Sequence, residues 1–152
     1  MRILLYTDGS CYNTGIGGWA FVVVFPDEEG ERVAVIGSGA TETTTSNRME
    51  LTAIIKGVEY ITKIYPHCTS IDVYSDSKLT VDGATKWLDR WVEKGWKNAH
   101  RKPVKNQDLW EEWIRTRDAF KGEISLNWIK AHNGDKYNEI ADKAASKARC
   151  SS

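Results

Sequence analysis

The feature that most constrains the fold is a change in the spacing of apolar residues about a third of the way along the chain. Three early segments have the length and the β-branched, apolar character of strands, and a Pro-Asp-Glu-Glu-Gly turn at 26–30 separates the last two: residues 2–7, 19–25 and 32–37. They predict an antiparallel meander. From Leu51 to Tyr65 the apolar residues instead recur at helical offsets, which predicts an amphipathic helix ending before Pro66.

Strand and helix patterns alternate through the rest of the chain. Residues 70–75 and 123–130 are expected to form strands. Helices are expected from Ser77 onward (interrupted at Gly83 and Gly95 and stopped by Pro103), over 109–120 with Asn106 as cap, and over 138–149. A meander followed by such alternation predicts an α/β fold, with a five-stranded mixed sheet of antiparallel and parallel strands flanked by helices.

Length and composition narrow the class of protein further. A chain of 152 residues fits one domain over 1–152 and can bury a core without cross-links. The longest apolar run has only strand length, so no membrane span is expected. The start of the chain does not resemble a signal peptide. The three cysteines, Cys11, Cys68 and Cys150, have no metal-binding spacing, and their odd number disfavours a disulfide framework. We therefore expect a cytoplasmic protein.

Charge is unevenly distributed along a chain with no net charge. The segment from Lys86 to Lys105 holds seven Lys or Arg and two acidic residues, so it carries +5 and the remainder −5. Such a separation suits a protein that attracts a polyanion at one place and holds cations at another. A solvated helix face is the alternative interpretation of a charge run.

Two aspartates follow predicted strands directly. Asp8 comes after the first strand and Asp76 after the strand at 70–75, and each is followed by Gly or Ser. Open sheets bind ligands beyond their strand ends, so both carboxylates are candidates for a functional site. Asp72 and Asp82 lie close by in the sequence, and spacing alone does not reject them.

Two further acids lie on predicted helices. Glu50 falls at the edge of the apolar stripe, where a carboxylate needs a cation or hydrogen bonds; a capping box with Asn47 is the local alternative. Asp142 falls early in the last helix, where the helix dipole alone accounts for an acid. Together the four carboxylates indicate a site for a hard cation such as Mg²⁺.

One histidine adds to this set. His132 lies in the polar, Gly-containing segment 131–136 after the last predicted strand, where an exposed imidazole is able to shuttle protons at neutral pH. An idle surface histidine is the competing interpretation.

Four ordered motifs resemble type 1 ribonuclease H over essentially the whole chain. They are Tyr6–Cys11, Thr44–Leu51, Tyr74–Ser77, and Trp128–Gly134 continuing through Asn138, Ala141 and Asp142. Gly95–Lys97 and Lys102–Asn106, followed by Leu109 and Trp110, are similar to the basic protrusion of that family.

The resemblance implies an endonuclease that cuts the RNA strand of an RNA–DNA hybrid, leaves 5′-phosphate and 3′-hydroxyl ends, and uses two Mg²⁺ ions, with Mn²⁺ as a substitute. It implies that Asp8, Glu50, Asp76 and Asp142 hold the metal and that His132 assists proton transfer or product departure. It also implies a monomer whose protrusion, with Trp87, Trp91 and Trp96, grips the DNA strand. The expected substrate-binding residues are Asn13, Thr45, Ser46, Asn47, Trp87, Lys94, Trp96, Lys97, Arg101 and Lys102.

The expected roles agree with the chemistry. Two divalent ions about 3.5–4 Å apart activate water and neutralise the departing oxygen. Choosing RNA over DNA requires contact with the 2′-hydroxyl, for which Asn13, Ser46 and Asn47 offer partners.

The sequence departs from the family pattern at two places. Ser46 stands where bacterial relatives usually carry Asn, and the loop at 12–16 is one residue short, so affinity and sequence preference are open. Two rival functions are a metal-dependent DNA nuclease or strand-transfer enzyme of the same fold, and a catalytically silent hybrid-binding module.

Overall fold

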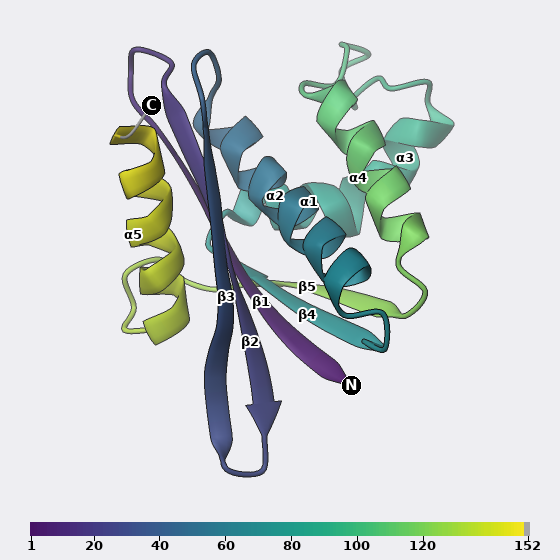
Figure 1. Ribbon diagram of the computed structural model, residues 1–152. Helices are drawn as coiled ribbons and strands as arrows, with labels where there is room; N and C mark the ends of the chain where they lie inside the picture. The colour runs from purple at the N-terminus through teal and green to yellow at the C-terminus, as the bar shows by residue number, and fades with distance from the viewer. Residues whose placement is uncertain (151–152) are drawn as a thin grey trace.

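The computed structural model describes residues 1–150 and is built around one mixed sheet (Figure 1). Its strands are β1 (Arg2–Cys11), β2 (Gly17–Asp27), β3 (Gly30–Thr41), β4 (Ser70–Ser75) and β5 (Glu123–Trp128). The order across the sheet is β3-β2-β1-β4-β5; β1, β2 and β3 are antiparallel, while β4 runs parallel to both β1 and β5. The five-stranded mixed sheet expected from the sequence is thereby confirmed.

Helices cover both faces of this sheet (Figure 1). The elements are α1 (Ser46–Ile64), α2 (Lys78–Asp82), the π-helical turn η1 (Gly83–Trp87), α3 (Leu88–Glu93), α4 (Gln107–Ala119) and α5 (Lys136–Cys150). α1 packs on β1 and β2 and carries α4 on its outer side, whereas α5 packs on the opposite face against β1, β2 and β3. Of the helices within residues 1–150, none has the length and apolarity needed to cross a membrane.

The core consists of two apolar layers, one on each side of the sheet. The larger layer lies under α1 and α4 and includes Leu5, Ile54 and Trp113, all almost fully buried. The smaller layer lies under α5, where Tyr6 stacks on Tyr74 at 4.8 Å between ring centroids. Burial of this apolar area on both faces fixes the sheet between its helices.

Several element boundaries differ from those expected. β5 ends at Trp128 and not at Lys130, and α5 begins at Lys136, two residues earlier than the apolar spacing suggested. Gly83 does not break the helix that follows Ser77, because the chain continues through the π-turn η1 into α3. A Cβ at Gly83 would lie 2.7 Å from Cζ2 of Trp110, so the glycine permits close packing on α4.

Of the two expected helix caps, Asn106 is confirmed as the N-cap of α4, whereas the capping box at the start of α1 does not form. The N-cap of α1 is Thr45, whose hydroxyl accepts from the Arg48 amide at 3.3 Å, so Asn47 and Glu50 form no capping box. Asn106 does precede α4, but its backbone is left-handed with φ 62° and its side chain makes no capping hydrogen bond. Glu50 is thereby freed from a local role in its own helix.

Candidate active site

Asp8 and Asp76 lie side by side because the strands that carry them are parallel neighbours. Thr7 of β1 is paired with Ser75 of β4, so the residue after each member of this pair reaches the same edge of the sheet. Asp8 is 4% exposed, and one of its carboxylate oxygens accepts a hydrogen bond from the Gly9 amide at 3.0 Å. The two strands thus deliver both predicted carboxylates to one place, beyond the end of β4.

Glu50 reaches the same place from α1 through a close backbone contact. A Cβ at Gly9 would lie 2.3 Å from the Glu50 amide nitrogen, so only glycine lets the first turns of α1 approach β1 this closely. Asp8, Glu50 and Asp76 each offer an oxygen within 4.8 Å of the others. Oε2 of Glu50 is buried without a hydrogen-bond partner.

Burial and mutual repulsion make this cluster unfavourable when all its members are ionised. Desolvation, followed by the charge of Asp76, raises the pKa of Asp8 to about 8. Desolvation, followed by the charge of Asp8, raises the pKa of Glu50 well above its usual value. A divalent cation relieves both effects, and carboxylate oxygens are the ligands that hard cations prefer.

Asp142 approaches the cluster from the other face of the sheet. It is half-buried on α5 and lies outside the group of three, but a hydrogen bond with Asp142 is among the causes that raise the pKa of Asp8. α5 is held close to β2 at Gly18, where a Cβ would lie 2.2 Å from the carbonyl oxygen of Ala145. The structure therefore places the fourth predicted carboxylate next to Asp8.

Two residues that the sequence did not single out as site residues hold Asp76. Nδ2 of Asn138, which is 3% exposed, donates to Oδ2 of Asp76 at 3.2 Å, and Nε1 of Trp128 donates to the Asp76 carbonyl at 3.2 Å. Asn138 lies one helical turn before Asp142, so both face the same edge of the sheet. That i, i+4 spacing is the signal that indicates its place in the site.

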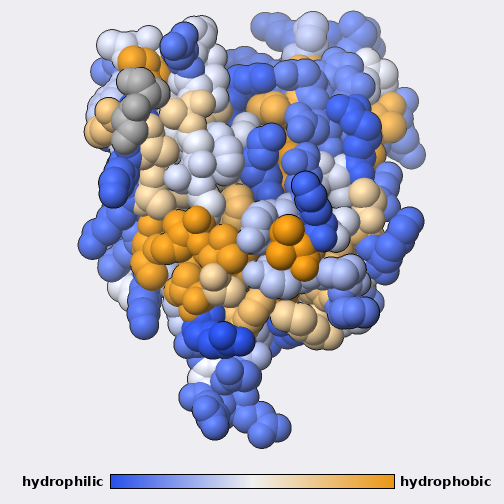
Figure 2. Space-filling view, viewed as in Figure 1, coloured by the Kyte–Doolittle hydropathy of each residue, from blue (hydrophilic) through white to orange (hydrophobic). Residues whose placement is uncertain are grey.

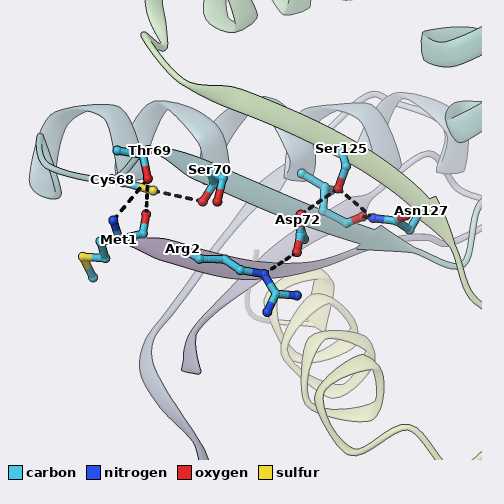
Figure 3. Close-up of polar contacts among 9 residues, drawn as sticks. Met1, Arg2, Cys68, Thr69, Ser70, Asp72, Ser125 and Asn127 are labelled. Carbon is cyan, nitrogen blue, oxygen red and sulfur yellow. Dashed lines mark hydrogen bonds and ion pairs between the residues drawn. The ribbon is translucent and has the colours of Figure 1, made fainter. Parts of the chain in front are cut away.

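The two other nearby aspartates have partners elsewhere. Asp72 accepts hydrogen bonds from Nε of Arg2 at 2.7 Å and from the Ser125 hydroxyl at 2.8 Å, in a polar group midway along β4 (Figure 3). Asp82 is paired with Lys78 at 3.0 Å and with Lys86 at 3.4 Å. Both carboxylates are therefore neutralised as ordinary ion pairs and do not belong to the cluster.

His132 lies outside the carboxylate cluster, on the loop from β5 to α5. It is exposed, and its backbone is left-handed with φ 54°. The same loop begins after Trp128 and ends near Asn138, the two residues that hold Asp76. The loop is thus tied to the cluster at both ends, while the imidazole remains open to solvent.

The predicted substrate-binding residues occupy two regions beside the cluster. Asn13 is exposed in the loop from β1 to β2, and Thr45, Ser46 and Asn47 are exposed where α1 begins. The basic residues lie on the irregular segment between α3 and α4, at the upper right of Figure 1, where Figure 2 shows mainly hydrophilic side chains.

Two hollows lie beside these residues. The first is a groove of about 520 Å³ between α1, α2 and the basic segment, lined among others by Asn47, Leu51 and Trp87. The second, of about 780 Å³, is lined by Trp87, Trp91 and a set of cations, Arg90, Lys94, Lys97 and Arg101. Trp96 is half-buried against the core, and Trp91 packs on Trp110 at 5.6 Å. Trp87 and Trp91 both line the two hollows, and of these two Trp87 is the exposed one.

Comparison with known proteins gives one consistent family. The family model described as RNase H matches residues 1–150. A ribonuclease H of Wolbachia pipientis is 42% identical over 148 residues, which cover 97% of this chain and 94% of the relative, and one of Ehrlichia chaffeensis is 40% identical over 145 residues, covering 95% and 92%.

Solved structures agree with the sequence relatives. The crystal structure of LC9-RNase H1, a type 1 RNase H with the type 2 active-site motif, superposes with a TM-score of 0.83 at 26% identity, covering 99% of this chain and 72% of that one. A foamy viral protease-reverse transcriptase in complex with an RNA/DNA hybrid shares the fold at 17% identity with a TM-score of 0.83, covering 99% of this chain and 20% of the viral one.

Proposed function

We propose that the carboxylates around Asp8 hold two divalent metal ions and form the catalytic site of this chain. The chain belongs to the ribonuclease H family and is an enzyme that hydrolyses the RNA strand of RNA–DNA hybrids. The observation that carries the proposal is the buried cluster of Asp8, Glu50 and Asp76, whose oxygens lie within 4.8 Å of one another. An all-carboxylate donor set with the unpartnered Oε2 of Glu50 suits Mg²⁺, and Mn²⁺ accepts the same ligands.

Each side chain has a separate task in this proposal. Asp8, Glu50, Asp76 and Asp142 hold the metal, and Asn138 keeps Asp76 oriented. When bound, the two ions supply an activated water and neutralise the departing 3′ oxygen of the cleaved bond. The exposed His132 takes up or delivers the proton at the edge of the site, and the products carry 5′-phosphate and 3′-hydroxyl ends.

The surfaces beside the cluster bind the two strands. Asn13 and the first turn of α1, with Thr45, Ser46 and Asn47, offer hydrogen-bond partners for the 2′-hydroxyls that distinguish RNA. The exposed cations of the segment between α3 and α4 bind the phosphates of the DNA strand, and Trp87 offers an apolar face to its sugars. These contacts make hybrid binding dependent on salt.

The proposed working unit is one catalytic domain acting as a cytoplasmic monomer. Support comes from the four carboxylates, which all belong to one chain and are carried by elements of one sheet and its helices. No second protein has to complete the site, so we propose that the hybrid duplex is the only partner that catalysis requires.

A cleavage assay on matched substrates tests this proposal. We expect the protein to cut the RNA strand of a labelled hybrid only when Mg²⁺ or Mn²⁺ is present, and to leave double-stranded DNA and double-stranded RNA of the same sequence intact. Cleavage of double-stranded DNA would favour a DNA nuclease of this fold. Hybrid binding with no metal-stimulated cleavage would favour a silent binding module and would contradict the assigned chemistry.

A further inference from the structure

Arg48 joins the beginning of α1 to the beginning of α4. Its Nη1 donates to Oδ1 of Asp108 at 2.9 Å, and its Nη2 donates to Oδ2 of the same carboxylate at 2.7 Å. Nη1 also donates to Oδ1 of Asn106 at 3.3 Å. Paired contacts of this kind fix both the direction and the separation of the two groups, which a single point contact does not.

The two helix ends that Arg48 joins are opposite walls of the groove. Asn47 and Leu51 line it from α1, while Asn106 and Trp110 line it from the start of α4. Arg48 is absent from the groove lining, and its side chain is 31% exposed. It therefore lies behind the wall that it supports.

The basic segment leads directly into the beginning of α4, which Arg48 holds. Val104 is buried and its amide donates to the Trp96 carbonyl at 3.0 Å, while the Asn98 amide donates to the Lys102 carbonyl at 2.8 Å. Three residues separate Lys102 from Asn106. A segment with these internal ties moves as a unit, so the position of Asn106 influences where Lys102 and its neighbours lie.

We propose that Arg48 is a positioning residue that sets the distance across the groove between the first turn of α1 and the basic segment, and thereby the affinity for the hybrid. This inference rests on the proposed function, because that function assigns the RNA strand to one wall and the DNA phosphates to the other. Arg48 touches no reacting atom in this proposal and acts through Asp108 and Asn106.

The competing role for Arg48 is direct contact with a phosphate, and the substitution Asp108→Asn separates the two. It releases the guanidinium while keeping its charge. As a positioning residue, Arg48 then loses its anchor, so hybrid affinity falls. As a phosphate ligand, Arg48 becomes free to bind, so affinity rises.

The experiment compares KM, kcat and the dissociation constant of a labelled hybrid, the last in EDTA. We expect Arg48→Ala and Asp108→Asn each to raise KM and Kd by roughly two- to fivefold, the range for a well-formed exposed ion pair, with kcat unchanged. The double variant should be no worse than the poorer single one. Arg48→Lys, which retains the charge without the fork, should fall between the wild type and Arg48→Ala.

Arg2→Ala is the matched control. Arg2 also pairs with an aspartate of a neighbouring element, Asp72 at 2.7 Å (Figure 3). Neither residue lines the groove. The Arg2→Ala variant should change the urea midpoint about as much as Arg48→Ala does, and it should leave KM and Kd unchanged. An unchanged Kd in Arg48→Ala, or tighter binding in Asp108→Asn, would overturn the inference. Wild-type protein that binds the hybrid without cutting it contradicts the proposed function alone.

Discussion

The carboxylate cluster and the basic segment between α3 and α4 are built in opposite ways. Asp8 and Glu50 are buried to more than nine-tenths and lie on, or packed against, the central strand of the sheet. The cations of the basic segment are exposed and belong to the irregular stretch between α3 and α4. The carboxylate cluster is thus part of the protein interior, whereas the cations lie on the protein surface.

The two kinds of charge differ in how much they destabilise the folded protein. Buried carboxylates that repel one another destabilise the protein unless a cation joins them, so each one needs a specific chemical role. Exposed cations cost little and gain little singly, so they act by number. Substitutions in the cluster should therefore affect catalysis steeply, whereas substitutions in the basic segment should affect affinity gradually.

The largest effect is expected from removing one charge of the cluster. Asp8→Asn or Asp76→Asn should lower kcat on a labelled hybrid by at least about a thousandfold, because metal charge stabilisation is worth several kcal/mol. Hybrid binding should survive, since the groove is untouched. Asp72→Asn is the control, because Asp72 is paired with Arg2 outside the cluster. Near-normal turnover by either cluster variant would remove the proposed site.

The same cluster should weaken the metal-free fold as pH rises. Burial, followed by the charge of Asp76, raises the pKa of Asp8 to about 8, so between about pH 4 and 8 the folded state holds a proton that the unfolded state releases. Stability conferred by this protonated form is therefore lost as pH rises.

Urea unfolding in EDTA at pH 5.5 and 8 tests this. Asp8→Asn should be more stable than the wild type by roughly 2–3 kcal/mol at pH 8 and by less at pH 5.5, because the amide carries no charge to bury. Mg²⁺ should stabilise the wild type much more than the variant. An equal difference at both pH values would mean that Asp8 is not repelled in the folded state.

The sequence predicted the part of the site that depends on strand ends. Asp8 and Asp76 were identifiable because each follows an apolar segment of strand character. In the structure Asp76 does follow β4, whereas β1 continues past Asp8 to Cys11, and the parallel pairing of β1 with β4 brings the two carboxylates together. The capping box was wrong because Thr45 and Asn47 are both good caps, and local preference does not choose between them. The choice is made by α1 packing on Gly9, a contact that links residues forty positions apart.

The partners of the supporting residues were not predictable from local pattern for the same reason. The spacing from Asp142 places Asn138 on the same helix face, but neither Asn138 nor Arg48 reveals its partner, because Asp76 and Asp108 lie 62 and 60 residues away. Asp72 was not separable from Asp76 until Arg2 and Ser125 were seen to pair with it. The sequence therefore predicted most of the helices and strands. It did not predict which side chains pair with one another when they are distant in the sequence.

An intermediate effect is expected at the boundary between the two regions. His132→Ala should lower kcat by roughly ten- to a hundredfold, toward or below the lower end of what a proton-transfer group contributes, and should leave KM nearly unchanged. His67→Ala is the control, because His67 is exposed in the loop from α1 to β4. A single-turnover measurement beside steady-state rates separates slower chemistry from slower product departure. Rates identical to the wild type in both would show that His132 is idle.

The smallest effect per residue is expected in the basic segment between α3 and α4, where several cations have to be removed together. Replacing Lys94, Lys97, Arg101 and Lys102 with Ala should raise KM by about tenfold at moderate salt and leave kcat near the wild-type value. The salt dependence of hybrid binding should also flatten, by about 0.9 in the logarithmic slope for each phosphate that the variant no longer neutralises.

The control for this variant removes four exposed cations elsewhere, Lys56, Lys63, Arg115 and Lys121, so that both proteins have the same net charge. If the two variants flatten the slope equally, long-range charge and not direct binding at the basic segment accounts for the affinity. If only the first does, the exposed cations bind phosphate as a group while the buried carboxylates carry the chemistry.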